Sequence, residues 1–344
     1  MSQDSATWQK GPFSGARKSV SVRAGGAANG EGLVRITPLQ EGTRAVTVAP
    51  VLDGVDVREW LAGSGDMLAR LRDEHGAVLL RGFAPLEAAG FGDLATALAG
   101  ELRDYDNRST PRQRVAGRVF TSTEYPADQT IPLHNEMSYS DSWPTMLFLT
   151  CLVPAAEGGE TPIADSARVY DRIPADTRER FERHGVMYVR NFGHGMDLSW
   201  QEVFQTDDRA VVDAYCAAHD IQAEWLGGER LRTRHVVQAS VQARATGRTL
   251  WFNQAHLFHV SSLPEAMERE LRESFAEDAL PRNALYGDGT PLDPEDLAQI
   301  RAAYVANEIA FPWQAGDVIL VDNEQFAHGR RPYSGARSVL VAMA

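Results

Sequence analysis

The chain has 344 residues, of which 43% are hydrophobic and 24% are charged, so it can bury a sizeable core. Its formal net charge is −13, and it contains no run of Lys and Arg, which argues against nucleic acid as a partner. No apolar stretch is long enough for a membrane span, the N-terminal residues lack a signal peptide's apolar segment, and two cysteines cannot make a disulfide framework, so we expect a cytoplasmic protein.

The N-terminal half predicts a tail followed by alternating helices and strands. Residues 1–33 are rich in Gly, Ser and Ala and are expected to form a flexible tail, whereas 34–344 is interpreted as one domain. Apolar residues recur at helical spacing over 55–76, and Gly-Ser-Gly at 63–65 divides that segment into two helices. Further elements follow: a buried strand over 77–83, a helix over 86–102, an apolar strand over 144–154 and a turn into a strand over 158–165.

The C-terminal half predicts an insertion and then more strands. Residues 166–245 are interpreted as a mostly helical insertion, in which Asp207 or Asp208 starts an amphipathic helix over 207–220. Strand-like runs return at 248–260, 317–323 and 338–344. Regular βαβ alternation and a phosphate-binding glycine motif are both missing. We therefore predict a mostly β fold with α insertions, namely a double-stranded β-helix (jelly-roll) core flanked by helices.

The stretch IPLHNEMSY, residues 131–139, places His134 and Glu136 two positions apart in an extended segment, so both would project from one face of a strand. Such a pair is either a hydrogen-bonded structural couple or part of a metal site, and alone it is a weak signal. His328 follows the strand-like run 317–323. Two histidines and a carboxylate form the facial triad of non-haem Fe(II) oxygenases, which leaves positions open for a bidentate co-substrate and O2.

Two more residues fit a co-substrate with a carboxylate. Arg337 comes nine residues after His328 and enters an apolar final strand, where a buried guanidinium needs an anion. The alternative is an arginine that caps a hairpin, which suits Arg330 or Arg331 better. Thr161 follows a glycine pair and could add a hydrogen bond to the same carboxylate, although an ordinary threonine at the start of a strand would look the same.

A more specific pattern extends from about residue 76 to the end of the chain. The stretches that carry it include GAVLLRGF, TSTEYPADQTIPLHNEMSY, PAAEGGETPIADSARVY, GVMYVRNF, LWFNQAHLFHV and FPWQAGDVILVDNEQFAHGRRPYSGARSVLVAMA. In these the chain resembles TauD/TfdA-type Fe(II)/2-oxoglutarate dioxygenases of the SyrP-like branch, and it is also similar to clavaminate-synthase-like amino-acid hydroxylases.

The resemblance implies roles for five residues. His134, Glu136 and His328 match the iron ligands of the family, and Thr161 and Arg337 match its 2-oxoglutarate-binding positions. The common family triad has Asp where this chain has Glu136, and the glutamate version is typical of branches that act on amino acids.

The resemblance also implies a reaction: hydroxylation of an unactivated C–H bond, at the β-carbon of an amino acid, in natural-product biosynthesis. The amino acid could be free or tethered to a peptidyl carrier domain, and the acidic charge slightly favours the free form. Desaturation or cyclisation by the same iron chemistry is an alternative outcome. A cupin-like, non-catalytic metal-binding protein is an alternative of another class, and it would explain the triad but not Thr161 and Arg337.

Four residues are candidate substrate contacts. If 248–260 is a strand, Asn253 and His256 share a face near the metal, or alternatively form hydrogen bonds within an inner strand. Arg190 and Asn191, in the stretch YVRNF, are the other candidates, with a structural ion pair as the alternative.

Overall fold

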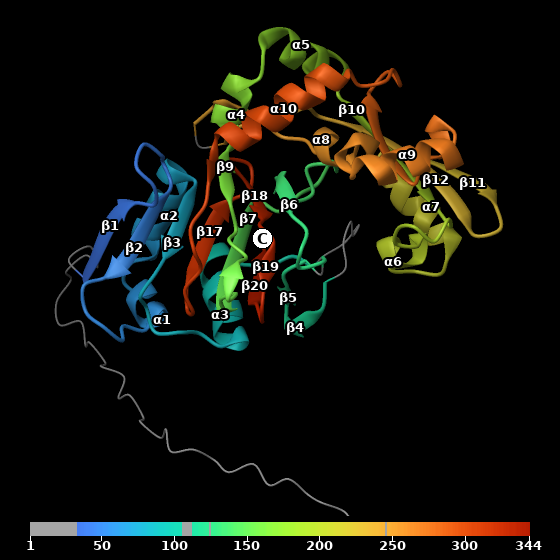
Figure 1. The fold of residues 1–344 in the computed structure, drawn as a ribbon. Coiled ribbons are helices and arrows are strands. Elements are labelled where there is room, and N and C mark those ends of the chain that lie inside the picture. The colour runs from blue at the N-terminus through green and yellow to red at the C-terminus, as the bar shows by residue number, and fades with distance from the viewer. Residues whose placement is uncertain (1–32, 105–111, 124, 245) are drawn as a thin grey trace, which may run out of the picture.

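The computed structural model describes residues 33–104, 112–123, 125–244 and 246–344 (Figure 1). The predicted tail therefore lies outside the described residues, except for Leu33. The largest element is a mixed sheet whose strands run in the order β1-β2-β3-β17-β7-β20-β5-β4, with only β2 and β3 parallel. The bounds in that order are Val34–Pro38, Val46–Pro50, Ala77–Leu80, Val318–Asp322, Met146–Val153, Ser338–Met343, Val119–Thr121 and Arg114–Ala116.

A second, four-stranded antiparallel sheet lies against the first. Its order is β16-β9-β18-β6, with bounds Glu308–Ile309, Ile163–Asp165, Phe326–Arg330 and Ile131–His134. Alternate side chains of the large sheet, such as Leu147 and Leu149, form one buried cluster with Ile163, Ile309 and Phe326 of the smaller sheet. This sheet-on-sheet core agrees with the predicted mostly β architecture.

The other face of the large sheet is covered by helices. These are α1 (Val57–Leu61), α2 (Gly65–His75) and α3 (Ala88–Ala99). Met146 and Phe148 point toward them, so β7 is buried on both faces, which explains its nearly continuous apolar run. The predicted division of the first helical segment is confirmed, because α2 begins directly after Ser64.

The predicted helical insertion is wrong in part, because residues 166–245 also hold three strands of an outer antiparallel sheet. That sheet has the order β11-β12-β10-β15, with bounds Gln222–Gly227, Arg230–Val237, Val186–Phe192 and Arg282–Tyr286. It lies at the right of Figure 1, away from the large sheet. Helices of this region are α4 (Ser166–Arg172), α5 (Ala175–His184), α6 (Trp200–Phe204) and α7 (Arg209–Ala218). The predicted start of α7 is confirmed, since Asp208 accepts a hydrogen bond from the backbone N–H of Ala210.

The predicted strand over 248–260 is also wrong beyond Trp251. Strand β14 covers Thr249–Trp251 and pairs with β13 (Ser240–Gln242), and the chain then turns into helix α8 (Ala255–Phe258). The other elements are β8 (Glu157–Gly158), β19 (Tyr333–Ser334), α9 (Glu265–Ser274), α10 (Pro294–Ala306) and two short 3-10 helices, η2 (Val260–Ser262) and η3 (Glu277–Ala279). Within the described part of the chain, no helix is long and apolar enough to span a membrane.

Candidate active site

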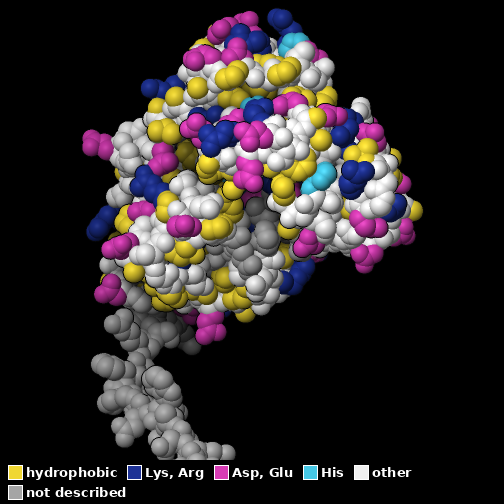
Figure 2. Space-filling view, turned by 45° about the vertical axis from the view of Figure 1, so that its right-hand side comes forward, with side chains coloured by type: hydrophobic (Ala, Val, Ile, Leu, Met, Phe, Trp, Pro, Cys, Tyr) yellow, Lys and Arg dark blue, Asp and Glu magenta, His cyan; other side chains and the backbone are white. Residues whose placement is uncertain are grey.

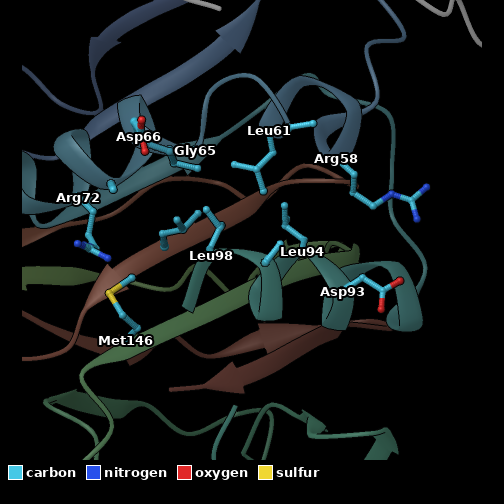
Figure 3. Close-up of a pocket in the computed structure, with 14 residues that line it drawn as sticks. Arg58, Leu61, Gly65, Asp66, Arg72, Asp93, Leu94, Leu98 and Met146 are labelled. Atoms are coloured by element: carbon cyan, nitrogen blue, oxygen red, sulfur yellow. The ribbon is translucent and has the colours of Figure 1, made fainter. Parts of the chain in front are cut away.

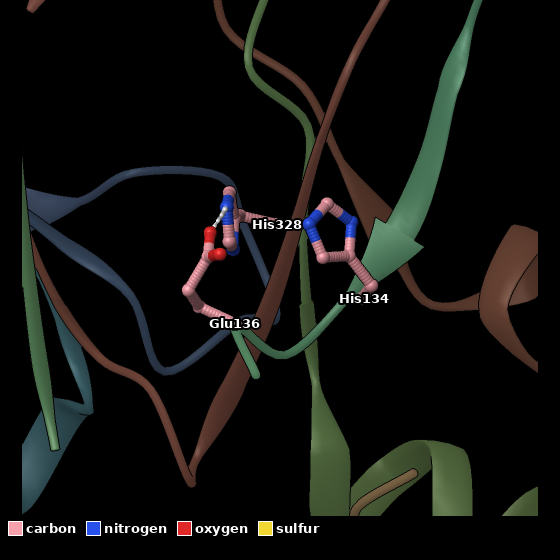
Figure 4. Close-up of side chains that lie close together, drawn as sticks. All are labelled: His134, Glu136 and His328. Atoms are coloured by element: carbon pink, nitrogen blue, oxygen red, sulfur yellow. Dashed lines mark ion pairs between the residues drawn. The ribbon is translucent and has the colours of Figure 1, made fainter. Parts of the chain in front are cut away.

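The three predicted metal ligands lie together at the smaller sheet (Figure 4). Strands β6 and β18 are antiparallel neighbours, and His134 is the register partner of His328. The Glu136 carboxylate reaches the same point, so that one ligand atom from each residue lies within 4.8 Å of the other two. Among the residues that the structure describes, no other group of three His, Cys, Asp or Glu side chains meets this condition.

The reason for this proximity differs from the predicted one. Strand β6 ends at His134, so Glu136 is not on the same strand face but in the turn that follows. The side chain of Asn323, at the turn between β17 and β18, holds that turn in place. Its Oδ1 accepts from the backbone N–H of Glu136 at 2.7 Å, and its Nδ2 donates to the carbonyl of Glu136 at 3.0 Å. Sequence reasoning missed Asn323, although its place between a strand and His328 was a usable signal.

The protonation states suit metal binding. Nδ1 of His134 lies 2.8 Å from the carbonyl oxygen of Pro132, which can only accept, so Nδ1 carries the proton and Nε2 is left as the ligand atom. Burial lowers the pKa of His134, and burial together with the neighbouring His134 lowers the pKa of His328 to about 3. Both imidazoles are therefore neutral at pH 7, which is the form that binds a metal.

Glu136 is kept ionised by a residue that sequence reasoning missed. Nη2 of Arg112 donates to Oε2 of Glu136 at 2.7 Å, and both side chains are buried. Burial would raise the pKa of Glu136, but the charge and the hydrogen bond of Arg112, together with the neighbouring histidines, outweigh it and hold the pKa below its usual value. Two neutral imidazoles and one carboxylate form a donor set without thiolate, which fits Fe(II).

A cavity of about 40 Å³ brings the predicted co-substrate residues to the same place. It is lined by both triad histidines and by Arg112, Thr161 and Arg337. This proximity could not be read from residue spacing, because Thr161 and Arg337 are 176 residues apart (337 − 161). Their side chains nevertheless line one cavity with His134 and His328.

Arg337 is prepared to bind an anion in this cavity. Its Nε donates to the carbonyl of Gly159 at 3.0 Å, and its Nη1 lies 3.4 Å from the Ser122 hydroxyl. Burial lowers the pKa of Arg337 to about 10, so the guanidinium is still charged at pH 7. Among the described residues, no carboxylate lies within 4.0 Å of this charge. Thr161 is buried beside it, and its hydroxyl accepts from the indole N–H of Trp313 at 3.1 Å.

The two alternative arginines are engaged elsewhere. Arg330 donates to the backbone carbonyls of Tyr125, Pro126 and Gln129, so it braces a loop. Arg331 forms an ion pair with Glu308 at the surface. Arg330 also lines the cavity, but its terminal nitrogens are bonded to these carbonyls, whereas Arg337 uses its Nε on the carbonyl of Gly159.

Two of the candidate substrate contacts are occupied by backbone groups. Asn253 donates to the carbonyl of Ala239 and accepts from the N–H of Ala255, and His256 lies 3.0 Å through Nε2 from the carbonyl of Leu133. Because the strand ends before them, the two do not share a strand face as predicted. These bonds favour the structural alternative for both residues.

The other two candidates, on β10, differ from each other. Asn191 donates to the carbonyls of Asp278 and Leu280 and accepts from Arg232, so its amide is used within the fold. Arg190 forms an ion pair with Asp197 at 3.6 Å, as the structural alternative expects, and it also lines a pocket with aromatic walls on the opposite face of the strand. That pocket is formed by Tyr139, Tyr188, Arg190, Phe192, Phe204, Ile221, Thr233, His235 and Phe258.

A larger cavity, of about 590 Å³, lies on the opposite face of the large sheet. It is enclosed by α1, α2, α3 and the strands β7 and β17, with Leu61, Leu94 and Leu98 among its apolar walls (Figure 3). Arg58 and Asp93 lie at its edge. It shares no lining residue with the cavity at the triad, so volume alone does not mark the active site here.

The family described as taurine catabolism dioxygenase TauD, TfdA family matches residues 35–343. The chain belongs to the TauD/TfdA family. It is 43% identical over 270 residues to the dapdiamide synthesis protein DdaC of Enterobacter agglomerans, which covers 78% of this chain and 82% of that protein. It is 34% identical over 288 residues to a clavaminate synthase-like protein of Arabidopsis thaliana, which covers 80% and 83%.

Solved structures show the same fold. The PvcB protein of Pseudomonas aeruginosa superposes with a TM-score of 0.54 at 16% identity, over 95% of this chain and 94% of that one. The AAD-2 structure with Mn(II) and N-oxalylglycine gives 0.53 at 14% identity, over 90% and 96%. The resemblance inferred from the sequence, the jelly-roll fold and the dioxygenase class are thus confirmed. As a TauD/TfdA dioxygenase, the protein uses Fe(II), 2-oxoglutarate and O2 and acts on a small molecule.

Proposed function

We propose that His134, Glu136 and His328 bind Fe(II), and that Thr161 and Arg337 hold the distal carboxylate of 2-oxoglutarate. The observation that carries this assignment is the shared cavity, which is lined by His134, His328, Thr161 and the partly buried Arg337, with Glu136 beside the two histidines. When bound, iron and 2-oxoglutarate would supply the chemistry that oxidises an unactivated C–H bond.

The chain's own residues position and shield that chemistry. Asn323 fixes the turn that carries Glu136, and the carbonyl of Pro132 orients the ring of His134. Arg337 offers its two terminal nitrogens to a carboxylate, because its Nε is already bonded to Gly159. Arg337 is only partly exposed to water, which strengthens that pairing.

We propose that the substrate is an amino acid and that the outcome is hydroxylation, at the β-carbon, within a natural-product pathway. The relative of 43% identity is a dapdiamide synthesis protein, which supports a biosynthetic role. Among the substrate candidates, Arg190 suits this role best: it is buried in an aromatic pocket beside Tyr139, which lies three residues after Glu136. The other three candidates would act indirectly, through hydrogen bonds to backbone groups that support the surrounding structure; they are Asn191, Asn253 and His256.

Whether the amino acid is free or held on a carrier domain affects the surface that the enzyme needs. On the face shown in Figure 2, positive and negative side chains are interspersed rather than gathered by sign. With a net charge of −13 this favours a free amino acid over docking on an acidic carrier domain.

The test is a mass-spectrometric screen of free and carrier-loaded amino acids with Fe(II), 2-oxoglutarate and O2. We expect a product that has gained one oxygen atom, succinate formed in equal amount, and no product from His328→Ala. A product that has lost two hydrogens would replace hydroxylation by desaturation. Turnover of only carrier-loaded substrates would overturn the preference for the free amino acid.

A further inference from the structure

Arg112, which keeps Glu136 ionised, also lies where it can act on the geometry of the metal site. Its guanidinium reaches the triad from the segment that precedes β4, at the edge of the large sheet, whereas the triad itself belongs to the smaller sheet. Nη2 lies 2.7 Å from Oε2 of Glu136, and Nη1 lies 3.8 Å from Sδ of Met343 on β20. Side-chain exposure is 5% for Arg112 and 4% for Glu136, so water does not compete for this bond.

The oxygen that Arg112 holds is also the one that faces the rest of the metal site. Oε2 of Glu136 lies 3.8 Å from Nε2 of His328. A carboxylate oxygen has two lone-pair directions, so it can accept from an arginine and bind a metal at the same time. The position of the guanidinium therefore sets the direction from which Glu136 presents Oε2.

Glu136 needs such a restraint more than a shorter acid would. It has one more rotatable side-chain bond than Asp, and it lies beyond the end of β6, so the strand does not fix its direction. The charge-assisted bond from Nη2 of Arg112 to Oε2 limits that rotation. We propose that Arg112 is a positioning residue, which through this single bond holds Oε2 of Glu136 in the orientation that a metal on His134 and His328 requires. This inference rests on the ligand set proposed above.

The experiment measures Co(II) affinity of the full chain by absorbance, without turnover. Loss of a partner that orients a metal ligand typically weakens binding about 10- to 100-fold, and we expect this for Arg112→Met and Arg112→Gln. Arg112→Lys keeps the charge and one donor, so it should recover part of the affinity. The matched control is Arg180→Met, which breaks the ion pair with buried Asp296 between α5 and α10. It should lower the melting temperature but bind Co(II) as the wild type does.

The outcomes separate this inference from the ligand assignment. If Glu136→Ala binds Co(II) as tightly as the wild type, the ligand set itself is wrong. If Glu136→Ala loses affinity while Arg112→Met keeps it, only the role of Arg112 is refuted. Should Arg112→Met not fold, Arg112→Gln fills much of the same space and decides the question in the same way. A purely structural arginine would shift the melting temperature and leave the Co(II) affinity unchanged.

Discussion

Replacing Arg337 by alanine should raise the 2-oxoglutarate requirement sharply while leaving metal affinity intact. The guanidinium is partly buried and charged, its Nε is bonded to the carbonyl of Gly159, and its side chain lines the cavity that contains the triad histidines. Removing one partner of a buried charge pair costs roughly 2–5 kcal/mol, which is about 30-fold to several-thousand-fold in binding.

The assay has two parts, with a matched control. Calorimetric titration of 2-oxoglutarate into Co(II)-loaded protein gives the affinity, and succinate formation gives the KM. Arg331→Ala is the control, because Arg331 lies on the same segment but is paired with Glu308 at the surface, and it should behave as the wild type. An unchanged affinity in Arg337→Ala would mean that another group holds the distal carboxylate.

Three further predictions follow from the same region and from the fold. Thr161→Val should weaken 2-oxoglutarate binding by about 10- to 150-fold, as expected for one hydrogen bond to a charged carboxylate, and an unchanged KM would remove Thr161 from the pocket. Gly159→Ala should also raise this KM, because Gly159 has φ +72° and a Cβ there would lie 3.0 Å from Cδ of Arg337; an unchanged KM would show that Arg337 has room to shift. Burial lowers the pKa of His259 to about 4. Below about pH 6.5 the unfolded state therefore binds a proton that the folded state does not yet bind. The stability of the protein should fall as the pH drops from about 6.5 to 4. His259→Asn should flatten that fall in urea unfolding, and the same slope in both proteins would contradict the assignment.

The sequence predicted the elements whose signal is local. Strands β7, β17 and β20 are apolar runs because both faces of the large sheet are covered, and α7 has a capping aspartate and a regular apolar stripe. The strands in 186–237 were not predicted, because β10 and β12 contain Arg, Asn and His. In the folded protein these polar side chains bind partners in other segments of the chain. Arg190 and Asn191 show this, since their partners come from residues 197, 232, 278 and 280.

The site residues show the same limit: those with a local sequence signal were predicted, and contacts between distant segments were not. The residue types of the triad and its two co-substrate partners could be read from motifs, but the groups that orient them could not. Arg112 lies 24 residues before Glu136, and Asn323 lies 187 residues after it. Neither belongs to a motif with the residue that it holds, so only the folded chain connects them. The strand argument for Glu136 failed because hydrogen bonds from Asn323, and not strand alternation, bring the carboxylate to the histidines.

The most direct test of the central claim is an anaerobic titration of the protein with Fe(II) and 2-oxoglutarate, followed by visible absorption. The account predicts a weak charge-transfer band in the wild type that requires both additions, and no band in His134→Ala, Glu136→Ala or His328→Ala. Circular dichroism of each variant should show that it is folded. A band of full intensity in any folded triad variant, or its absence from the wild type, would contradict the proposed metal site.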